Sequence, residues 1–89
     1  MKQTKYKTVF VNMMPDDFEE GVLYMAPHFE CAMHNCMCGC GAKVCTPITE
    51  GQWKWTFDGE NVSLTPSVGN FSISCKSHYF LRNGIVQWC

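Results

Sequence analysis

The sequence carries little charge of either sign. Only 17% of its 89 residues are charged, and seven Lys and Arg stand against eight Asp and Glu, which gives a formal net charge of −1. A protein that binds nucleic acid usually presents a basic face, whereas the basic residues here are scattered along the chain. The composition therefore disfavours nucleic acid as a partner.

The sequence also lacks a long apolar run. The run near its start extends from Val9 to Met14, is interrupted by Asn12 and ends at Pro15. A membrane helix needs about 20 apolar residues, and a secretory signal also needs a longer apolar centre. We therefore expect a cytoplasmic protein with no membrane partner, in a compartment where thiols stay reduced.

Cysteine, in contrast, is abundant. Seven cysteines occur in 89 residues, a length that predicts one domain over residues 1–89 with a core of modest stability. Such small domains commonly add a metal or disulfides. A disulfide framework usually has an even number of cysteines, and the number here is odd. Metal ligation therefore explains the cysteines better.

Three of the cysteines occupy alternate positions in a segment that also contains two glycines. Cys36, Cys38 and Cys40 lie within five residues. Alternate residues of an extended chain point to the same side, and Gly39 and Gly41 permit the positive φ that would turn the backbone around an ion. We interpret this segment as one half of a zinc site.

The second half of the site is the segment Cys75-Lys76-Ser77-His78. Tetrahedral zinc selects thiolates and imidazoles, so Cys75 and His78 join the first three cysteines as candidate ligands. Five candidates exceed the four that one zinc ion binds, and we expect Cys36 or Cys38 to be the one left over. The other candidates are interpreted as packing, strand-end or surface residues: His28, Cys31, His34, Cys45 and Cys89.

Apolar alternation and turn residues predict an all-β domain of zinc-ribbon-like antiparallel hairpins. Residues 16–21 suit at most one helical turn, because acidic residues open the segment and Gly21 closes it. Cys75 to Ser77 must turn before the next strand begins, since a spacing of three cannot place Cys75 and His78 on one face. Strands are expected in the first half at residues 7–13, 22–25, 29–34 and 42–46.

Two hairpins are the clearest structural signals. Asp58-Gly59 and Asn83-Gly84 are two-residue turns of the type that needs positive φ, and residues 64–70 are expected to form the loop between the hairpins. Each hairpin should bury one apolar face, with Trp53, Trp55 and Phe57 in the core. The expected cross-strand pairs are Trp55 with Val62, Trp53 with Leu64, Tyr79 with Trp88 and Leu81 with Val86.

Ser67 is the serine that we considered as a nucleophile. No histidine lies within a recognisable nucleophile motif around it. The sequence therefore does not predict a serine hydrolase.

In their joint order, the motifs resemble the small bacterial domain of unknown function 6527 family. The resemblance covers most of the chain and implies a compact, β-rich, metal-binding domain with zinc as the metal. Some members of that family are encoded near bacterial ubiquitin-like conjugation genes, which implies a protein partner from such a system. The matching segments are residues 21–24, 36–41, 53–57, 63–68, 75–79 and 84–88.

Three functions follow from these observations. The favoured one is a structural zinc module that serves protein recognition or acts as an accessory subunit, and not as a catalyst. The alternative is a Rieske-like iron–sulfur redox protein, although a Rieske box needs a histidine two residues after its first cysteine and position 38 is Cys38. A zinc hydrolase ranks last, because Glu30 and Glu50 are the glutamates closest in sequence to the ligands and neither falls in a hydrolase motif. The oligomeric state is not predicted.

Overall fold

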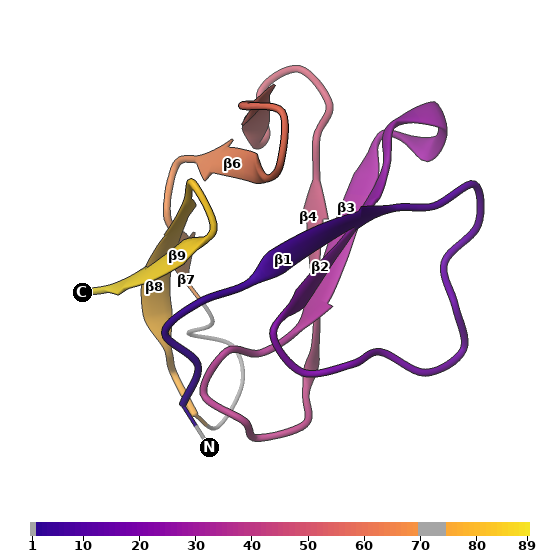
Figure 1. Ribbon diagram of the computed structural model, residues 1–89. Helices are drawn as coiled ribbons and strands as arrows, with labels where there is room; N and C mark the ends of the chain where they lie inside the picture. Colours follow the sequence, from indigo (N-terminus) through magenta and orange to yellow (C-terminus); the bar gives the residue numbers. More distant parts are fainter. Residues whose placement is uncertain (1, 70–74) are drawn as a thin grey trace.

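The computed structural model describes residues 2–69 and 75–89, and its elements are almost all β-strands (Figure 1). The predicted all-β fold is confirmed. Within the described residues no helix is long and apolar enough to cross a membrane. The strands are β1 (Lys7–Phe10), β2 (Val22–Ala26), β3 (Cys31–Asn35), β4 (Lys43–Pro47), β5 (Lys54–Phe57), β6 (Val62–Thr65), β7 (Val68–Gly69), β8 (His78–Arg82) and β9 (Ile85–Trp88).

The first four strands form one sheet in the order β1-β2-β3-β4. β1 and β2 run parallel, whereas β2 pairs with β3 and β3 with β4 in antiparallel fashion. All five residues of β2 are buried, because this strand lies inside the sheet, and its sequence is accordingly apolar throughout instead of alternating. This sheet leads the chain from the end of β3 directly into the cysteine-rich segment.

The predicted strands of the first half are found with shifted ends. The strand predicted over residues 7–13 ends at Phe10, and Val11 adds one more backbone hydrogen bond to Met25 O at 2.9 Å. The strand predicted from residue 29 begins at Cys31, because Pro27–Phe29 form the short 3-10 helix η1. Residues 16–21, expected to form at most one helical turn, contain bends and a turn and no helix, which agrees with that upper limit.

The β8–β9 hairpin matches the sequence prediction in turn and register. Asn83 and Gly84 have φ values of 52° and 79°, as the two-residue turn requires. Tyr79 pairs with Trp88 and Leu81 with Val86. β7 joins this hairpin on the other side of β8, within a segment that was predicted as loop.

The β5–β6 hairpin differs from its prediction by two residues in register. Phe57 pairs with Val62 and Trp55 with Leu64, so the connection has four residues instead of two. The Asp58 carboxylate explains the longer loop, because its Oδ1 accepts hydrogen bonds from the backbone N–H groups of Glu60 and Asn61, both at 2.8 Å. An Asp side chain that caps its own loop competes with the tight turn.

The face that was predicted to be buried in this hairpin is only partly covered. Val62 and Leu64 are fully buried, whereas Trp55 and Phe57 remain 37% and 50% exposed. The ring of Phe10 covers part of them, with its centroid 5.2 Å from that of Phe57. The predicted core position of these two aromatic residues is therefore wrong, because Phe10, the ring that packs on them, is itself 46% exposed.

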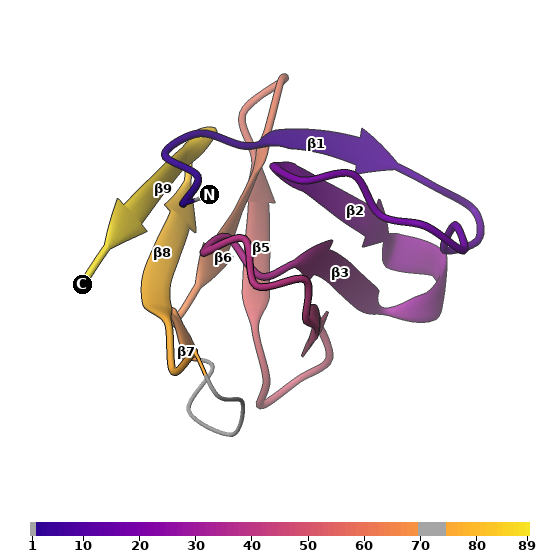
Figure 2. The ribbon, with the colours of Figure 1, turned by 90° about the horizontal axis from the view of Figure 1, so that it is seen from below.

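The core joins the three sheets. Figure 2 shows the β8–β9 hairpin on one side of the β5–β6 hairpin and strands β1 to β3 on the other. Leu23 and Met25 of β2, Leu64 of β6 and Tyr79 of β8 belong to one buried cluster. The Tyr79 hydroxyl accepts a hydrogen bond from the backbone N–H of Met37 at 3.4 Å, which brings the segment after β3 against the start of β8.

Candidate functional site

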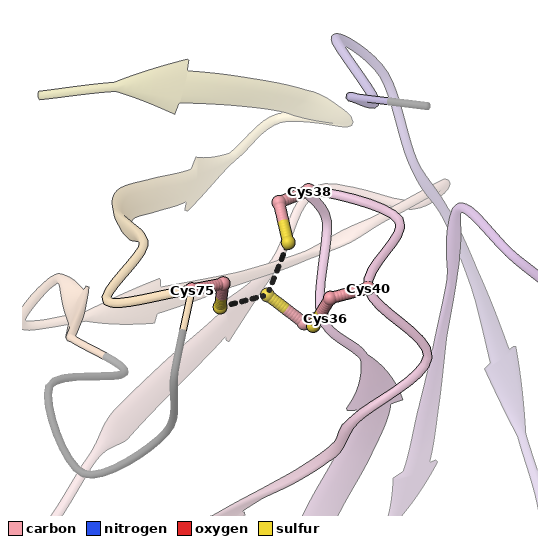
Figure 3. Close-up of side chains that lie close together, drawn as sticks. All are labelled: Cys36, Cys38, Cys40 and Cys75. Atoms are coloured by element: carbon pink, nitrogen blue, oxygen red, sulfur yellow. Dashed lines mark hydrogen bonds between the residues drawn. The ribbon is translucent and has the colours of Figure 1, made fainter.

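Four cysteines from two distant segments come together in the structure (Figure 3). The Sγ atoms of Cys36, Cys38, Cys40 and Cys75 all lie within 4.8 Å of one another. Cys36 Sγ is 3.4 Å from Cys38 Sγ and 3.5 Å from Cys75 Sγ. Four sulfur ligands at about 2.3 Å from a tetrahedral zinc ion are about 3.8 Å apart. The donor type and the spacing therefore fit one four-coordinate zinc ion.

Positive backbone angles bring the two segments to this point. Gly39 and Gly41 have φ values of 88° and 84°, and the Cys36 N–H donates to Ala42 O at 2.8 Å, which closes the loop that carries three of the ligands. On the other segment, Lys76 has a φ of 48°. The chain therefore turns between Cys75 and the start of β8, as the spacing of the two candidate ligands predicted.

Hydrogen bonds favour the thiolate form of Cys75. The Ser77 hydroxyl donates to Cys75 Sγ at 3.4 Å, and this bond, together with one from the Ser77 backbone, lowers the pKa of the Cys75 thiol to about 6. Burial instead raises the pKa of the Cys36 thiol. Metals bind the thiolate form, and of these two cysteines Cys75 is the one whose surroundings favour that form.

His78, the fifth candidate, lies outside the four-cysteine group. Cys36 and Cys38, one of which was expected to be left over, both belong to that group. A Rieske centre needs two histidines among its ligands, whereas the group found in the described part of the chain consists of thiols.

The other sulfur and imidazole candidates have different surroundings. Cys31 Sγ and Cys45 Sγ lie 3.4 Å apart on β3 and β4, away from the four-cysteine group, and burial, followed by the contact with Cys45, raises the pKa of Cys31 to about 11. Cys89 and His28 are exposed, as predicted. His34 is fully buried instead of lying at a polar strand end, and its Nε2 is 2.8 Å from the Tyr79 hydroxyl.

His78 contacts Ser67. The Ser67 Oγ lies 2.7 Å from His78 Nε2, and both side chains are half-buried. The register of β7 and β8 explains the contact, because Gly69 pairs with His78 and Val68 with Tyr79. Continuing that register by one residue places Ser67 on the same face of the sheet as His78, as a diagonal neighbour.

The sequence interpretation missed this pair. A search for a local nucleophile motif fails because the serine and the histidine are 11 residues apart and meet only through strand pairing. A signal was nevertheless present, since Ser67 and His78 fall in two of the segments on which the family resemblance depends. The pairing of β7 with β8 was not predicted, because residues 64–70 were expected to form a loop and β7 (Val68–Gly69) lies inside that segment. Residue 70 lies outside the described residues.

A comparison with known families gives a match over residues 10–89, to a family model described as bacterial ubiquitination-like system serine protease (BubE). No curated protein and no solved structure matches the chain. The matched span includes all four cysteines of the group and the Ser67–His78 pair. A bacterial family tied to a ubiquitination-like system was expected from the sequence motifs, and that link is confirmed, although the family matched is not the one that the motifs suggested.

Proposed function

This chain belongs to the family of bacterial ubiquitination-like system serine proteases, and we propose that it is a serine peptidase in which Ser67 is the nucleophile and His78 the general base. The observation that carries the proposal is the 2.7 Å contact between Ser67 Oγ and His78 Nε2. A nucleophile and a base within hydrogen-bond reach are the first requirement of this chemistry. We therefore assign His78 to the serine and not to the metal.

The proposed reaction begins with neutral His78, whose ring proton is on Nδ1. The Nε2 lone pair then accepts the Ser67 hydroxyl proton while Oγ attacks the carbonyl carbon of the scissile bond. When the tetrahedral adduct collapses, the C–N bond breaks and His78 gives that proton to the departing amine. Water then attacks the ester on Ser67 with His78 again as the base, which releases the acid and restores the serine.

The family description supports a polypeptide substrate. A serine protease cleaves an amide bond, and the matched family acts within a bacterial ubiquitination-like system. We propose that the substrate is a protein of that system, which also provides the protein partner expected from the sequence. The reaction needs no metal, so the cysteine group has a separate role.

We propose that the four cysteines hold one structural zinc ion. With Cys36, Cys38, Cys40 and Cys75 as ligands, the coordination sphere is complete and leaves no position for a reacting water. When bound, the ion supplies folding free energy and links the loop after β3 to the segment before β8. Because Cys75 is three residues before His78, that link fixes the start of the strand that carries the base. The structural zinc function inferred from the sequence is thus kept, but within a catalytic domain.

The proposal is tested with a fluorophosphonate probe, which reacts covalently with activated serines. We expect the probe to modify Ser67 in the zinc-loaded protein, to leave Ser67→Ala unlabelled and to label His78→Ala at least about 100-fold more slowly, because the serine then lacks its base. Ser63→Ala is the matched control and should label like the parent protein. Labelling of Ser67→Ala at the parent rate, or no labelling of folded, zinc-loaded parent protein, would contradict the proposal and favour the accessory or recognition function.

A further inference from the structure

A pocket of about 140 Å³ is lined in part by the residue that precedes the proposed nucleophile. Its lining residues are Gly51, Gln52, Trp53 and Pro66, and Pro66 is bonded directly to Ser67. A cavity of about 150 Å³ in another protein is large enough to bind benzene. The pocket therefore has room for one side chain of medium size.

The fold brings these four residues together at the open end of the β5–β6 hairpin. Lys54 pairs with Thr65, so extending the register by one residue places Trp53 opposite Pro66. The backbone N–H of Trp53 also donates a hydrogen bond to Pro47 O at 3.1 Å. Trp53 therefore lies between the end of β4 and the segment that leads to Ser67.

A glycine keeps one side of the pocket open. The Gln52 N–H donates to Thr49 O at 3.0 Å, which closes a turn in which Gly51 has a φ of +85°. A Cβ added at Gly51 would meet no atom within 4 Å. The space around this position is therefore open, and because Gly51 lines the pocket, we expect a longer side chain at residue 51 to reduce its volume.

The chemistry of the lining favours an apolar ligand. Trp53 and Pro66 contribute apolar rings, and the lining residues carry no charge. The pocket therefore offers a ligand apolar surface and no partner for a charged group.

We propose that this pocket binds the apolar side chain of the residue whose carbonyl Ser67 attacks, with leucine or phenylalanine as the preferred size. The inference rests on the proposed function, because it concerns the substrate of the same serine. A side chain held beside Ser67 fixes the position of its own carbonyl, and such positioning is how binding energy accelerates the chemical step. A small side chain would leave part of the pocket empty. A charged side chain would find no group of opposite charge among the lining residues.

The test uses p-nitrophenyl esters of N-acetyl phenylalanine, leucine, alanine and aspartate. We expect kcat/KM of the parent protein to be at least about tenfold higher for the phenylalanine and leucine esters than for the other two, a difference typical of a filled apolar pocket. Gly51→Asn keeps a residue that tolerates positive φ but fills the pocket, and it should reduce the ratio of phenylalanine to alanine turnover about tenfold.

Gly59→Asn is the matched control. Gly59 also has a positive φ, of +103°, and open space around its missing Cβ, but it lies in the loop at the other end of the β5–β6 hairpin. Its substrate ratio should equal that of the parent protein. Because each ratio compares two substrates on one preparation, partial unfolding of a variant cancels out.

The outcomes separate the two proposals. Turnover with a ratio that Gly51→Asn leaves unchanged overturns the pocket assignment alone, as does a parent protein that prefers the alanine or aspartate ester. Absence of turnover, together with absence of fluorophosphonate labelling at Ser67, overturns the proposed peptidase function and the pocket assignment with it. A loss of ratio in Gly59→Asn equal to that in Gly51→Asn also overturns the assignment, because the effect would then not be local.

Discussion

Cys75 and His78 lie on one short segment, yet their side chains belong to two different groups. Cys75 Sγ is 3.5 Å from Cys36 Sγ, whereas His78 Nε2 is 2.7 Å from Ser67 Oγ. Their spacing in the sequence suggests one ligand pair, and the fold separates them. The segment therefore connects the proposed metal centre to the proposed catalytic base.

Metal analysis of single variants tests this separation. We expect His78→Ala to keep one zinc ion per chain, and Cys75→Ser to lose it and to melt more than about 10 °C lower, because a structural ion contributes folding free energy. The measurements are elemental analysis and thermal unfolding. Cys45→Ser is the control, since it removes a thiol outside the group, and it should leave both values unchanged. Zinc loss in His78→Ala with retention in Cys75→Ser would reverse the assignment of the two side chains.

Gly84→Ala should destabilise the protein through a close contact as well as through its backbone. Gly84 has a φ of +79°, and an added Cβ would lie 2.7 Å from Asn61 Nδ2. That side chain cannot move freely, because its Oδ1 accepts a hydrogen bond from the Thr8 N–H at 2.9 Å. We expect a loss of about 2–3 kcal/mol in the free energy of unfolding, measured by urea denaturation.

Gly59→Ala provides the matched comparison for that prediction. Gly59 also has a positive φ, but an added Cβ would meet nothing within 4 Å. The loss should be about 1 kcal/mol, the cost of the backbone conformation alone. Equal losses in the two variants would show that the contact with Asn61 contributes nothing.

Asp58 should make part of the stability depend on pH. Its carboxylate accepts two backbone hydrogen bonds, from Asn61 and Glu60, and these lower its pKa in the folded protein. Since the pKa is lower in the folded than in the unfolded state, the stabilisation is fully present above the unfolded value of about 4 and is lost as the pH falls through the folded value.

The test for Asp58 compares the parent protein with Asp58→Asn by urea denaturation between pH 7 and pH 3. We expect the difference in unfolding free energy between the two proteins to be constant above about pH 5 and to shrink below about pH 4. The thiols titrate alike in both proteins, so their contribution cancels in the difference. A difference that stays constant down to pH 3 would contradict the assigned role of the carboxylate.

Leu64→Ala and Phe57→Ala compare two positions on one face of the β5–β6 hairpin. Leu64 is fully buried, whereas Phe57 is 50% exposed. Removing the Leu64 side chain should cost about 2–4 kcal/mol, because it leaves a cavity. Phe57→Ala should cost about 1 kcal/mol or less, since much of its ring is already in water. Thermal and urea unfolding measure both values, and a larger loss for Phe57→Ala would place it in the core after all.

The contrast between the two hairpins explains how much of the fold the sequence predicts. At Asn83-Gly84, both central residues accept positive φ and nothing competes, so turn and register follow from the dipeptide. At Asp58-Gly59, the carboxylate accepts hydrogen bonds from the backbone N–H groups of Glu60 and Asn61, and a longer loop forms. The dipeptide alone does not show whether the two-residue turn or the longer loop is more stable.

The candidate site divides in the same way. The cysteine group was predictable, because closely spaced thiols beside glycines are typical of a metal site. The Ser67–His78 pair was not, because it depends on β7, a strand of two residues with no pattern of its own. A site whose residues are close together in the sequence can be recognised from the sequence. A site whose residues meet through strand pairing can be recognised only when the register of the strands is known.

The first residues of the chain are bound to the last ones. The Trp88 indole N–H donates to Gln3 O at 2.8 Å, across 85 positions of sequence, and the Tyr6 N–H donates to Gly84 O at 2.9 Å. These two contacts can form only after the segment from Gly84 to Trp88 has been synthesised. The residues ahead of β1 therefore reach their final positions late in folding, after the β8–β9 hairpin is available to receive them.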